Sequence, residues 1–498
     1  MDFGLRKPRC IMFARNHQGH FSNLTLAIGL AGSLLGFAVG ILAGVQPLYL
    51  ALGMGAVVVV LCFFKNFEAT VLGLLLLRSA LDPFSAQQIP AAFAIGAIVL
   101  TLLYVVAMAL TERPIHTDGF WWFFAGWTAV QGLWVMLLPL GLLGMDGSFW
   151  PESLREWIRL CSWVMVYLLV MQMKATTSPQ RVIACLFWSL LIPLTVAALQ
   201  VIAPSVLPPI FSGVTGAGIE SIGEVSRVNG TLGLANTFAT FCLLFLLLTW
   251  WQIGQVKRRW PWLLLLGAIV FFIVSTKSLF VLLMMAIAIL VLTAPRLKAI
   301  ELLGGMAILT IAIGLFAGSD AGRERLASLY ATPLLNPDID VSRAILLSAT
   351  DNNSFNWRIA QWTFLLQAWQ QYPVMGYGLL TCSKLTVLHN YAHNEYVRAL
   401  TEGGIVGLIA FIGFLGVQIG RLLYLARQSP PGSDRRNFCW TLLAMLLATI
   451  VGMITENIWT HTTLFFYWWT LMAVAGWDWQ ESPQSYGVVE QQQTEVYL

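Results

Sequence analysis

The sequence predicts an all-α polytopic membrane protein with 12 to 14 transmembrane helices and one long outer loop that contains short amphipathic helices. Of its 498 residues, 58% are hydrophobic and only 10% are charged, whereas soluble proteins carry about 25% charged residues. The 21 tryptophans and 12 tyrosines fit this class, because their amphipathic rings favour the membrane–water interface. The composition therefore excludes a soluble globular protein.

Fourteen apolar runs come close to the ~20 residues that a helix needs to span a bilayer. They lie at 24–44, 47–64, 67–81, 91–110, 120–143, 157–173, 182–203, 232–253, 261–275, 278–294, 299–317, 403–425, 438–456 and 462–477. The third, ninth, tenth and last runs are short, so twelve full spans is the lower count. An even number of spans places both termini on the same side of the membrane.

The positions of the basic residues orient these spans. Most of the 28 Lys and Arg residues fall in segments that are cytoplasmic if the N-terminus is inside, as the positive-inside rule requires for short loops. The first apolar run is full length and lacks a small-residue cleavage site, so we expect an uncleaved first helix rather than a signal peptide. Both termini are therefore predicted to be cytoplasmic.

The apolar runs also divide the chain into four parts. Residues 1–317 are expected to form the first eleven transmembrane helices with an outer loop at 204–231, 318–402 a periplasmic loop domain, 403–477 the C-terminal transmembrane helices and 478–498 a cytoplasmic tail. Within the long loop, the stretch from Trp357 to Tyr372 is predicted to be an amphipathic helix that ends at Pro373. Its tryptophans would place it along the bilayer surface.

The segment from Tyr391 to Gly407 is the most informative part of the chain. His393, Glu395, Arg398 and Glu402 stand within ten residues of the apolar run that starts at Gly403. Ionisable groups this close to hydrocarbon cost several kcal/mol unless they are paired, solvated or used in function. The sequence therefore predicts a working site at the membrane surface.

Several of these residues also have a structural interpretation. Glu402 lies four residues after Arg398, so an intrahelical ion pair is preferred to a general-base role. The glycines at 403, 404 and 407 have the spacing of close helix packing. Asp338 and Asp340 are interpreted as loop surface, and the seven cysteines show neither a disulfide framework nor metal-type spacing. We expect no metal ion and no cofactor.

Three groups of residues before and within the long loop resemble the O-antigen ligase and O-antigen polymerase superfamily. The resemblance covers roughly residues 225–425. It is carried by Arg227 with Gly230 and Asn236; by Arg358 with Pro373 and Gly376-Tyr377-Gly378; and by His393-Asn394 leading to Glu402-Gly403 and Gly407.

The resemblance implies a GT-C-like glycosyltransferase of the bacterial inner membrane. Such an enzyme moves a glycan from undecaprenyl diphosphate to an acceptor sugar on the periplasmic face, with inversion and without a metal. Its partners would be the lipid-linked glycan, an acceptor glycolipid or second lipid-linked glycan, and membrane lipids, with no nucleic acid. Both ligation and polymerisation fit, and ligation is preferred.

The resemblance also assigns roles to residues. Arg227 and Arg358 would bind the diphosphate, and His393 would act near the acceptor hydroxyl. Supporting candidates are Lys277, Asn394, Glu402 and Tyr377. The family often shows Ser-Arg where this chain has Ser275-Thr-Lys277-Ser278, so a phosphate contact there would come from a point charge instead of a bidentate fork.

The same chemistry follows from the residue types. Expelling a diphosphate needs fixed positive charge where negative charge develops, and arginine pairs bidentately with phosphate oxygens. A hydroxyl nucleophile is helped by a base with a pKa near neutral, which is typical of histidine. Taken singly, each residue also fits a loop cation or an interfacial hydrogen-bonding group, and only their combination indicates catalysis.

Two other functions are compatible with a polytopic protein. A secondary transporter of a small anion such as bicarbonate would place its site near the bilayer midplane on broken helices, often in repeated halves. Here the candidate residues collect at the outer surface. A scaffold for envelope assembly would have no need of His393.

Overall fold

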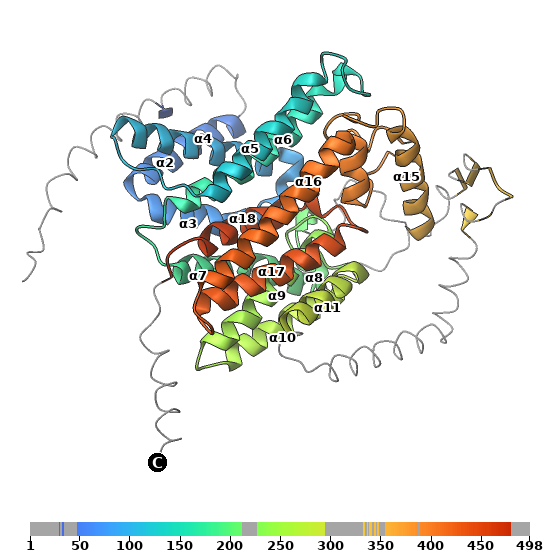
Figure 1. Cartoon of the computed structure of the whole chain (residues 1–498). Coiled ribbons are helices and arrows are strands. Elements are labelled where there is room, and N and C mark those ends of the chain that lie inside the picture. The colour runs from blue at the N-terminus through green and yellow to red at the C-terminus, as the bar shows by residue number, and fades with distance from the viewer. Residues whose placement is uncertain are drawn as a thin grey trace, which may run out of the picture.

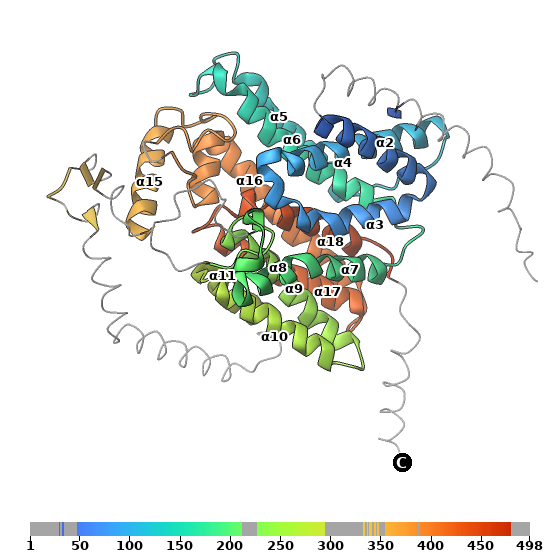
Figure 2. The same ribbon diagram turned by 180° about the vertical axis from the view of Figure 1, so that it is seen from behind.

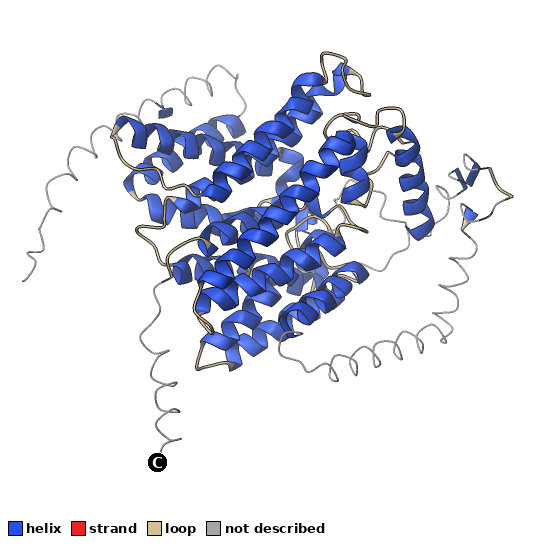
Figure 3. Cartoon of the chain, viewed as in Figure 1, coloured by secondary structure: helices blue, strands red, loops and turns tan. Residues whose placement is uncertain are grey.

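The computed structural model describes residues 47–211, 227–293, 354–386 and 389–479, together with isolated residues at 29, 32–33 and between 332 and 347. These residues form α-helices and short 3-10 helices, and no strand occurs among them (Figures 1 and 3). The all-α prediction is confirmed. The α-helices are α2 (Pro47–Lys65), α3 (Phe67–Leu77), α4 (Ile89–Leu110), α5 (Gly119–Leu137), α6 (Trp150–Met171), α7 (Pro179–Ser189), α8 (Leu191–Ile202), α9 (Ala235–Gln255), α10 (Trp260–Ser275), α11 (Leu279–Thr293), α15 (Ser354–Trp369), α16 (Glu395–Gln428), α17 (Asp434–Gly452) and α18 (Thr462–Ala475).

Four helical stretches of the described chain are long and apolar enough to cross a membrane. They are α4, the consecutive pair α7–α8 (Pro179–Ile202), α9 and α16, and the shorter apolar helices are α10, α11 and α18. The protein is therefore an all-α polytopic membrane protein, while the count of 12 to 14 spans stays a prediction. The runs predicted at 24–44 and 299–317 lie outside the described residues, apart from positions 29, 32 and 33.

The centre of the bundle is built around α18 and α9. Every residue of α18 from Thr463 to Ala475 is buried, and α9 is buried along most of its length. α18 packs against α6, α7, α9 and α17, and α17 in turn packs against α16, α11 and α9. A helix that is apolar on all sides and surrounded by other helices is typical of a core position. Figures 1 and 2 show α2, α3 and α4 on the flank opposite α15.

α16 is broken near its beginning. The helix starts at Glu395 rather than at Gly403, because Asn394 caps it, and its backbone leaves the helical region at Gly404 (φ 63°, ψ −164°). A helix break exposes N–H and C=O groups that need partners. The turn between Pro373 and Gly378 provides them: Tyr377 N–H donates to Thr401 O (3.1 Å), Gly378 N–H to Glu402 O (2.9 Å) and Ile405 N–H to Pro373 O (2.9 Å).

This turn connects α16 to α15, which runs from Ser354 to Trp369 and so begins and ends three residues earlier than predicted. Two of the tryptophans of α15 contact the segment before α16, and the position of this helix along the bilayer surface stays a prediction. Trp362 Nε1 donates to Ala392 O (2.7 Å), and the Trp357 ring lies edge-on to His393 with 5.2 Å between ring centroids. α15 therefore packs on the segment immediately before α16.

The break in α16 gives a test of how this region is held. Gly404→Ala is expected to lower the free energy of unfolding by about 2 kcal/mol or more, because its backbone conformation is essentially restricted to glycine. The added Cβ would also clash with the backbone of Val374. Thermal unfolding in detergent, followed by tryptophan fluorescence, measures the effect.

Gly413→Ala in the same helix is the matched control. Its Cβ would meet nothing within 4 Å, and alanine favours a helix over glycine by roughly 0.5–1 kcal/mol. Equal melting temperatures for the two variants would show that the break is not fixed by Gly404.

Candidate active site

Arg227 is held at the turn between α10 and α11, just before α9 begins. Its Nε donates to Thr276 O (2.9 Å), and its Nη2 donates to Asn236 Oδ1 (2.8 Å) and to Ser278 Oγ (2.9 Å). Ser278 Oγ also donates to Asn236 Oδ1 (2.7 Å). These contacts fix the plane of the guanidinium, and they leave Nη1 without a partner among the described residues.

His393 lies two residues before α16 and faces the segment between α17 and α18. Its Nδ1 is 3.2 Å from Glu456 Oε1, and its backbone N–H donates to Asn457 Oδ1 (2.7 Å). The edge of Trp357 covers the imidazole ring from the side of α15. The backbone at His393 is left-handed (φ 48°), a conformation in which histidine is enriched among non-glycine residues.

Glu456 and Asn236 connect these two residues. Asn236 Nδ2 donates to Glu456 Oε2, while Asn236 Oδ1 accepts from Arg227. The four side chains form one continuous chain from Arg227 through Asn236 and Glu456 to His393, which we call the Arg–His chain. Two residues that lie 166 positions apart in the sequence numbering, 227 and 393, thus belong to one site.

Glu456 is a buried carboxylate in this chain, with 4% of the residue exposed. Burial alone raises the pKa of Glu456. The adjacent His393 and His461 and the N–H of Asn457 outweigh this effect and lower the pKa to about 2. The N–H donors of Asn236 and Asn457 also favour the ionised form of this carboxylate.

Arg358 lies in the first turns of α15, directly after Trp357, and its side chain is half-buried. Because the Trp357 ring contacts His393, the part of α15 that carries Arg358 lies beside the Arg–His chain. The structure thus brings Arg227 and His393 together through named contacts and sets the helix of Arg358 next to them.

The supporting candidates lie in different places. Lys277 is exposed, has a left-handed backbone (φ 54°), and stands between Thr276 and Ser278, which both contact Arg227. Asn394 is the N-cap of α16, and its Oδ1 accepts from the N–H groups at 396 and 397 (3.0 Å each). Tyr377 is buried and its hydroxyl donates to Ala368 O (2.9 Å), which joins α15 to the turn after it.

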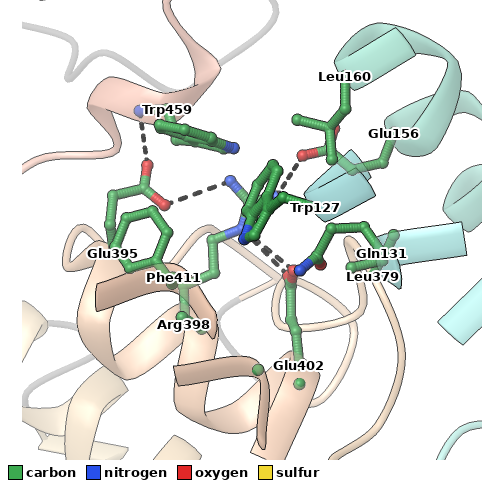
Figure 4. A pocket seen from close by; sticks show the side chains of 13 residues that line it. Trp127, Gln131, Glu156, Leu160, Leu379, Glu395, Arg398, Glu402, Phe411 and Trp459 are labelled. Atoms are coloured by element: carbon green, nitrogen blue, oxygen red, sulfur yellow. Dashed lines mark hydrogen bonds and ion pairs between the residues drawn. The ribbon is translucent and has the colours of Figure 1, made fainter. Parts of the chain in front are cut away.

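Glu402 belongs to a buried ionic cluster centred on Arg398 (Figure 4). Arg398 Nε lies 3.2 Å from both oxygens of Glu402, as the i, i+4 spacing predicted. Its Nη2 pairs with Glu156 Oε1 of α6 (2.8 Å), and its Nη1 with Glu395 Oε2 (3.4 Å). Glu395 Oε1 accepts from the N–H of Trp459 (2.8 Å). The cluster therefore ties α16 to α6 and to the segment before α18.

A cavity of about 60 Å³ lies against this cluster. Its walls combine the charged groups with apolar and aromatic side chains, among them Trp127, Leu160, Phe411 and Trp459, and with Gln131 (Figure 4). Among the described residues, no three or more His, Cys, Asp or Glu side chains are grouped in a way that could hold a metal ion.

Sequence reasoning missed Glu456, which completes the Arg–His chain. It was counted as the last residue of the predicted span 438–456, although α17 ends at Gly452. A carboxylate at the end of an apolar run is itself a sign of function, and Asn457 beside it adds a second polar group. That signal was present in the sequence.

Part of the chain matches a known protein family. Residues 261–412 match the family model Wzy_C, described as O-antigen ligase. This match confirms the resemblance to the O-antigen ligase and O-antigen polymerase superfamily. The matched range includes Lys277, Arg358, Tyr377, His393 and Glu402. No curated protein matches the chain.

The Arg398 cluster generates a stability prediction. Arg398→Met is expected to lower the free energy of unfolding by about 3–5 kcal/mol, because it leaves the buried carboxylates of Glu395 and Glu402 without their cation and Glu156 with Arg159 alone. Arg155→Met on α6 removes an exposed arginine and should change stability by no more than about 0.5 kcal/mol. Thermal unfolding of both variants in the same detergent gives the comparison, and equal stabilities would contradict a structural role for the cluster.

Proposed function

We propose that this protein is an inverting, metal-independent membrane glycosyltransferase that moves a glycan from undecaprenyl diphosphate to an acceptor sugar on the periplasmic face of the bacterial inner membrane. The single observation that carries the proposal is the Arg–His chain, which places a fixed cation and a histidine base in one site. The match to the O-antigen ligase family gives the substrate class, a lipid-linked glycan.

Arg227 is suited to bind the diphosphate leaving group. Nε and Nη2 hold the side chain, which leaves Nη1, with no partner among the described residues, to bind a phosphate oxygen. A preorganised guanidinium stabilises the negative charge that develops as the phosphate leaves. Arg358, on the helix beside His393, would supply the second cation, and Lys277 stands next to both turn residues that hold Arg227.

His393 is suited to take the proton of the acceptor hydroxyl. Its Nδ1 faces Glu456, and its Nε2 has no hydrogen-bond or ion-pair partner among the described residues. In the reaction, the acceptor oxygen forms a bond to the anomeric carbon from the side opposite the diphosphate, and its proton passes to His393 Nε2. The bond from the anomeric carbon to the phosphate oxygen breaks, and its electron pair leaves with the lipid diphosphate. The configuration is therefore inverted.

The transporter alternative receives no support from the family match. α16 is a broken helix, a feature common in transporters. The break at Gly404 is filled by the turn between Pro373 and Gly378, whose backbone pairs with it. The backbone groups at the break are therefore paired with the protein's own turn.

The test of the proposal is transfer activity in purified protein. His393→Ala, Arg227→Ala and Arg358→Ala are each expected to reduce the transfer of glycan from undecaprenyl diphosphate by about a hundredfold or more, because each removes the base or a charge that stabilises the leaving group. Gel analysis of labelled lipid-linked glycan measures the rate.

His389→Ala and Lys384→Ala are the matched controls, since both residues are exposed in the same loop and neither contacts the Arg–His chain. They should keep the wild-type rate. Unchanged turnover in all three site variants would reject the proposed function.

The acceptor decides between ligation and polymerisation. We propose ligation, so the expected product is the glycan joined to a different anchor, with undecaprenyl diphosphate released once per transfer. Mass spectrometry of products formed with lipid-linked glycan, with and without an added glycolipid acceptor, distinguishes the two reactions. A ladder of growing chains on undecaprenyl diphosphate would instead establish polymerisation.

A further inference from the structure

We infer that Glu456 and Asn236 are positioning residues that set which nitrogen of His393 is basic and couple that base to the cation at the leaving group. This inference rests on the proposed function. It assigns a role to two side chains that both lie outside the range 261–412 matched by the family. Asn236 precedes this range and Glu456 follows it.

The direction of every hydrogen bond in the Arg–His chain follows from its first member. Arginine has only donors, so the Asn236 atom that faces Arg227 Nη2 and Ser278 Oγ is its oxygen. The other end of the Asn236 amide is then NH₂, which donates to Glu456 Oε2. Glu456, an ionised carboxylate, can only accept.

The same logic fixes the tautomer of His393. The Glu456 carboxylate lies 3.2 Å from Nδ1, and its negative charge favours the tautomer with the proton on Nδ1, which leaves the lone pair of the neutral imidazole on Nε2. Nε2 has no hydrogen-bond or ion-pair partner among the described residues, so it is the nitrogen that can receive a proton. The contacts from Arg227 through Asn236 and Glu456 therefore favour the tautomer of His393 in which Nε2 can act as a base.

The Arg–His chain has no net charge before the reaction and gains one positive charge when His393 is protonated. Before reaction, Arg227 and Glu456 carry opposite charges and His393 is neutral. When His393 takes the acceptor proton, the new imidazolium lies beside the Glu456 carboxylate. A carboxylate in this position stabilises the imidazolium and holds the ring in orientation without itself taking the proton.

The other groups near Glu456 do not compete for this role. His461 is buried, and its Nδ1 lies 2.8 Å from Thr240 Oγ1. Burial lowers the pKa of His461 to about 4, so it stays neutral. Asn457 contacts the backbone of His393 and donates its own N–H to Glu456 Oε1 (3.0 Å). Trp357 presents a ring edge to His393.

Glu456→Gln is the decisive substitution, because it keeps the size of the side chain and its ability to accept from Asn236. With its oxygen held by Asn236, the amide NH₂ takes the place of Oε1, loses the bond from the Asn457 N–H, donates to His393 Nδ1 and moves the imidazole proton to Nε2. The expected result is a loss of about a hundredfold or more in kcat, with KM for the lipid-linked donor changed by less than about threefold, as for a histidine held in the wrong tautomer.

Three further variants complete the experiment. Glu456→Asp keeps the carboxylate and should retain more kcat than Glu456→Gln. Asn236→Asp keeps the acceptor for Arg227 but turns a donor toward Glu456 into a second carboxylate, so kcat should fall. Asp118→Asn is the control: it removes an ion-paired carboxylate at the start of α5, whose partner is Arg421 and which contacts no member of the Arg–His chain, and its folded fraction should keep the wild-type kcat. Wild-type kcat in Glu456→Gln would overturn the inference.

A readout without turnover separates this inference from the proposed function. Two-bond ¹⁵N–¹H spectra of ¹⁵N-histidine protein, assigned through His393→Gln, report which ring nitrogen carries the proton. We expect a proton on Nδ1 in the wild type and on Nε2 in Glu456→Gln. The same tautomer in both proteins would refute the inference, even if transfer is confirmed. Failure of every transfer assay, with the tautomer shift present, would refute the proposed function alone.

Discussion

The site depends on how the beginning of α16 is attached to the segment 453–461. Three hydrogen bonds make this attachment: Glu395 N–H to Met453 O (2.9 Å), Trp459 N–H to Glu395 Oε1 (2.8 Å) and His393 N–H to Asn457 Oδ1 (2.7 Å). They place the residues before α16 against the turn that carries Glu456. His393 and Glu456 lie in two different connecting segments, and these three hydrogen bonds help to set the distance between them.

Two buried features stabilise the beginning of α16, which makes this attachment. The Arg398 cluster joins α16 to α6 through Glu156, and the turn 373–378 pairs with the break in α16. Trp134 Nε1 of α5 also donates to Met375 O of that turn (2.7 Å). Polar groups in a helical bundle of low dielectric are costly when unpaired. Their mutual satisfaction therefore sets the position of α16 relative to α5, α6 and α15.

The sequence predicted the helices well because the apolar runs are long and their ends are marked by polar residues. The spans at 91–110 and 261–275 agree with α4 and α10 to within two residues. The i, i+4 pair of Arg398 and Glu402 was also predictable, since it is local. Glu156 as a partner of Arg398 was not, because the two residues are 242 positions apart and only the packing of α6 on the site brings them together.

In the candidate site, too, the sequence indicates which residue types are needed, but it does not indicate how they are positioned. Arg227 and His393 were predicted from the sequence because phosphate binding and proton transfer demand those residue types, and their roles stay predictions. The roles of Asn394 and Tyr377 could not be read from type alone, because a cap and a tertiary hydrogen bond depend on where the helices begin and meet. Arg227 and Glu456 lie on either side of the range 261–412 that matches the family. His393 lies within that range, whereas Arg227 and Glu456 are contributed by flanking segments, so the Arg–His chain forms only when these segments pack together around α9 and α18.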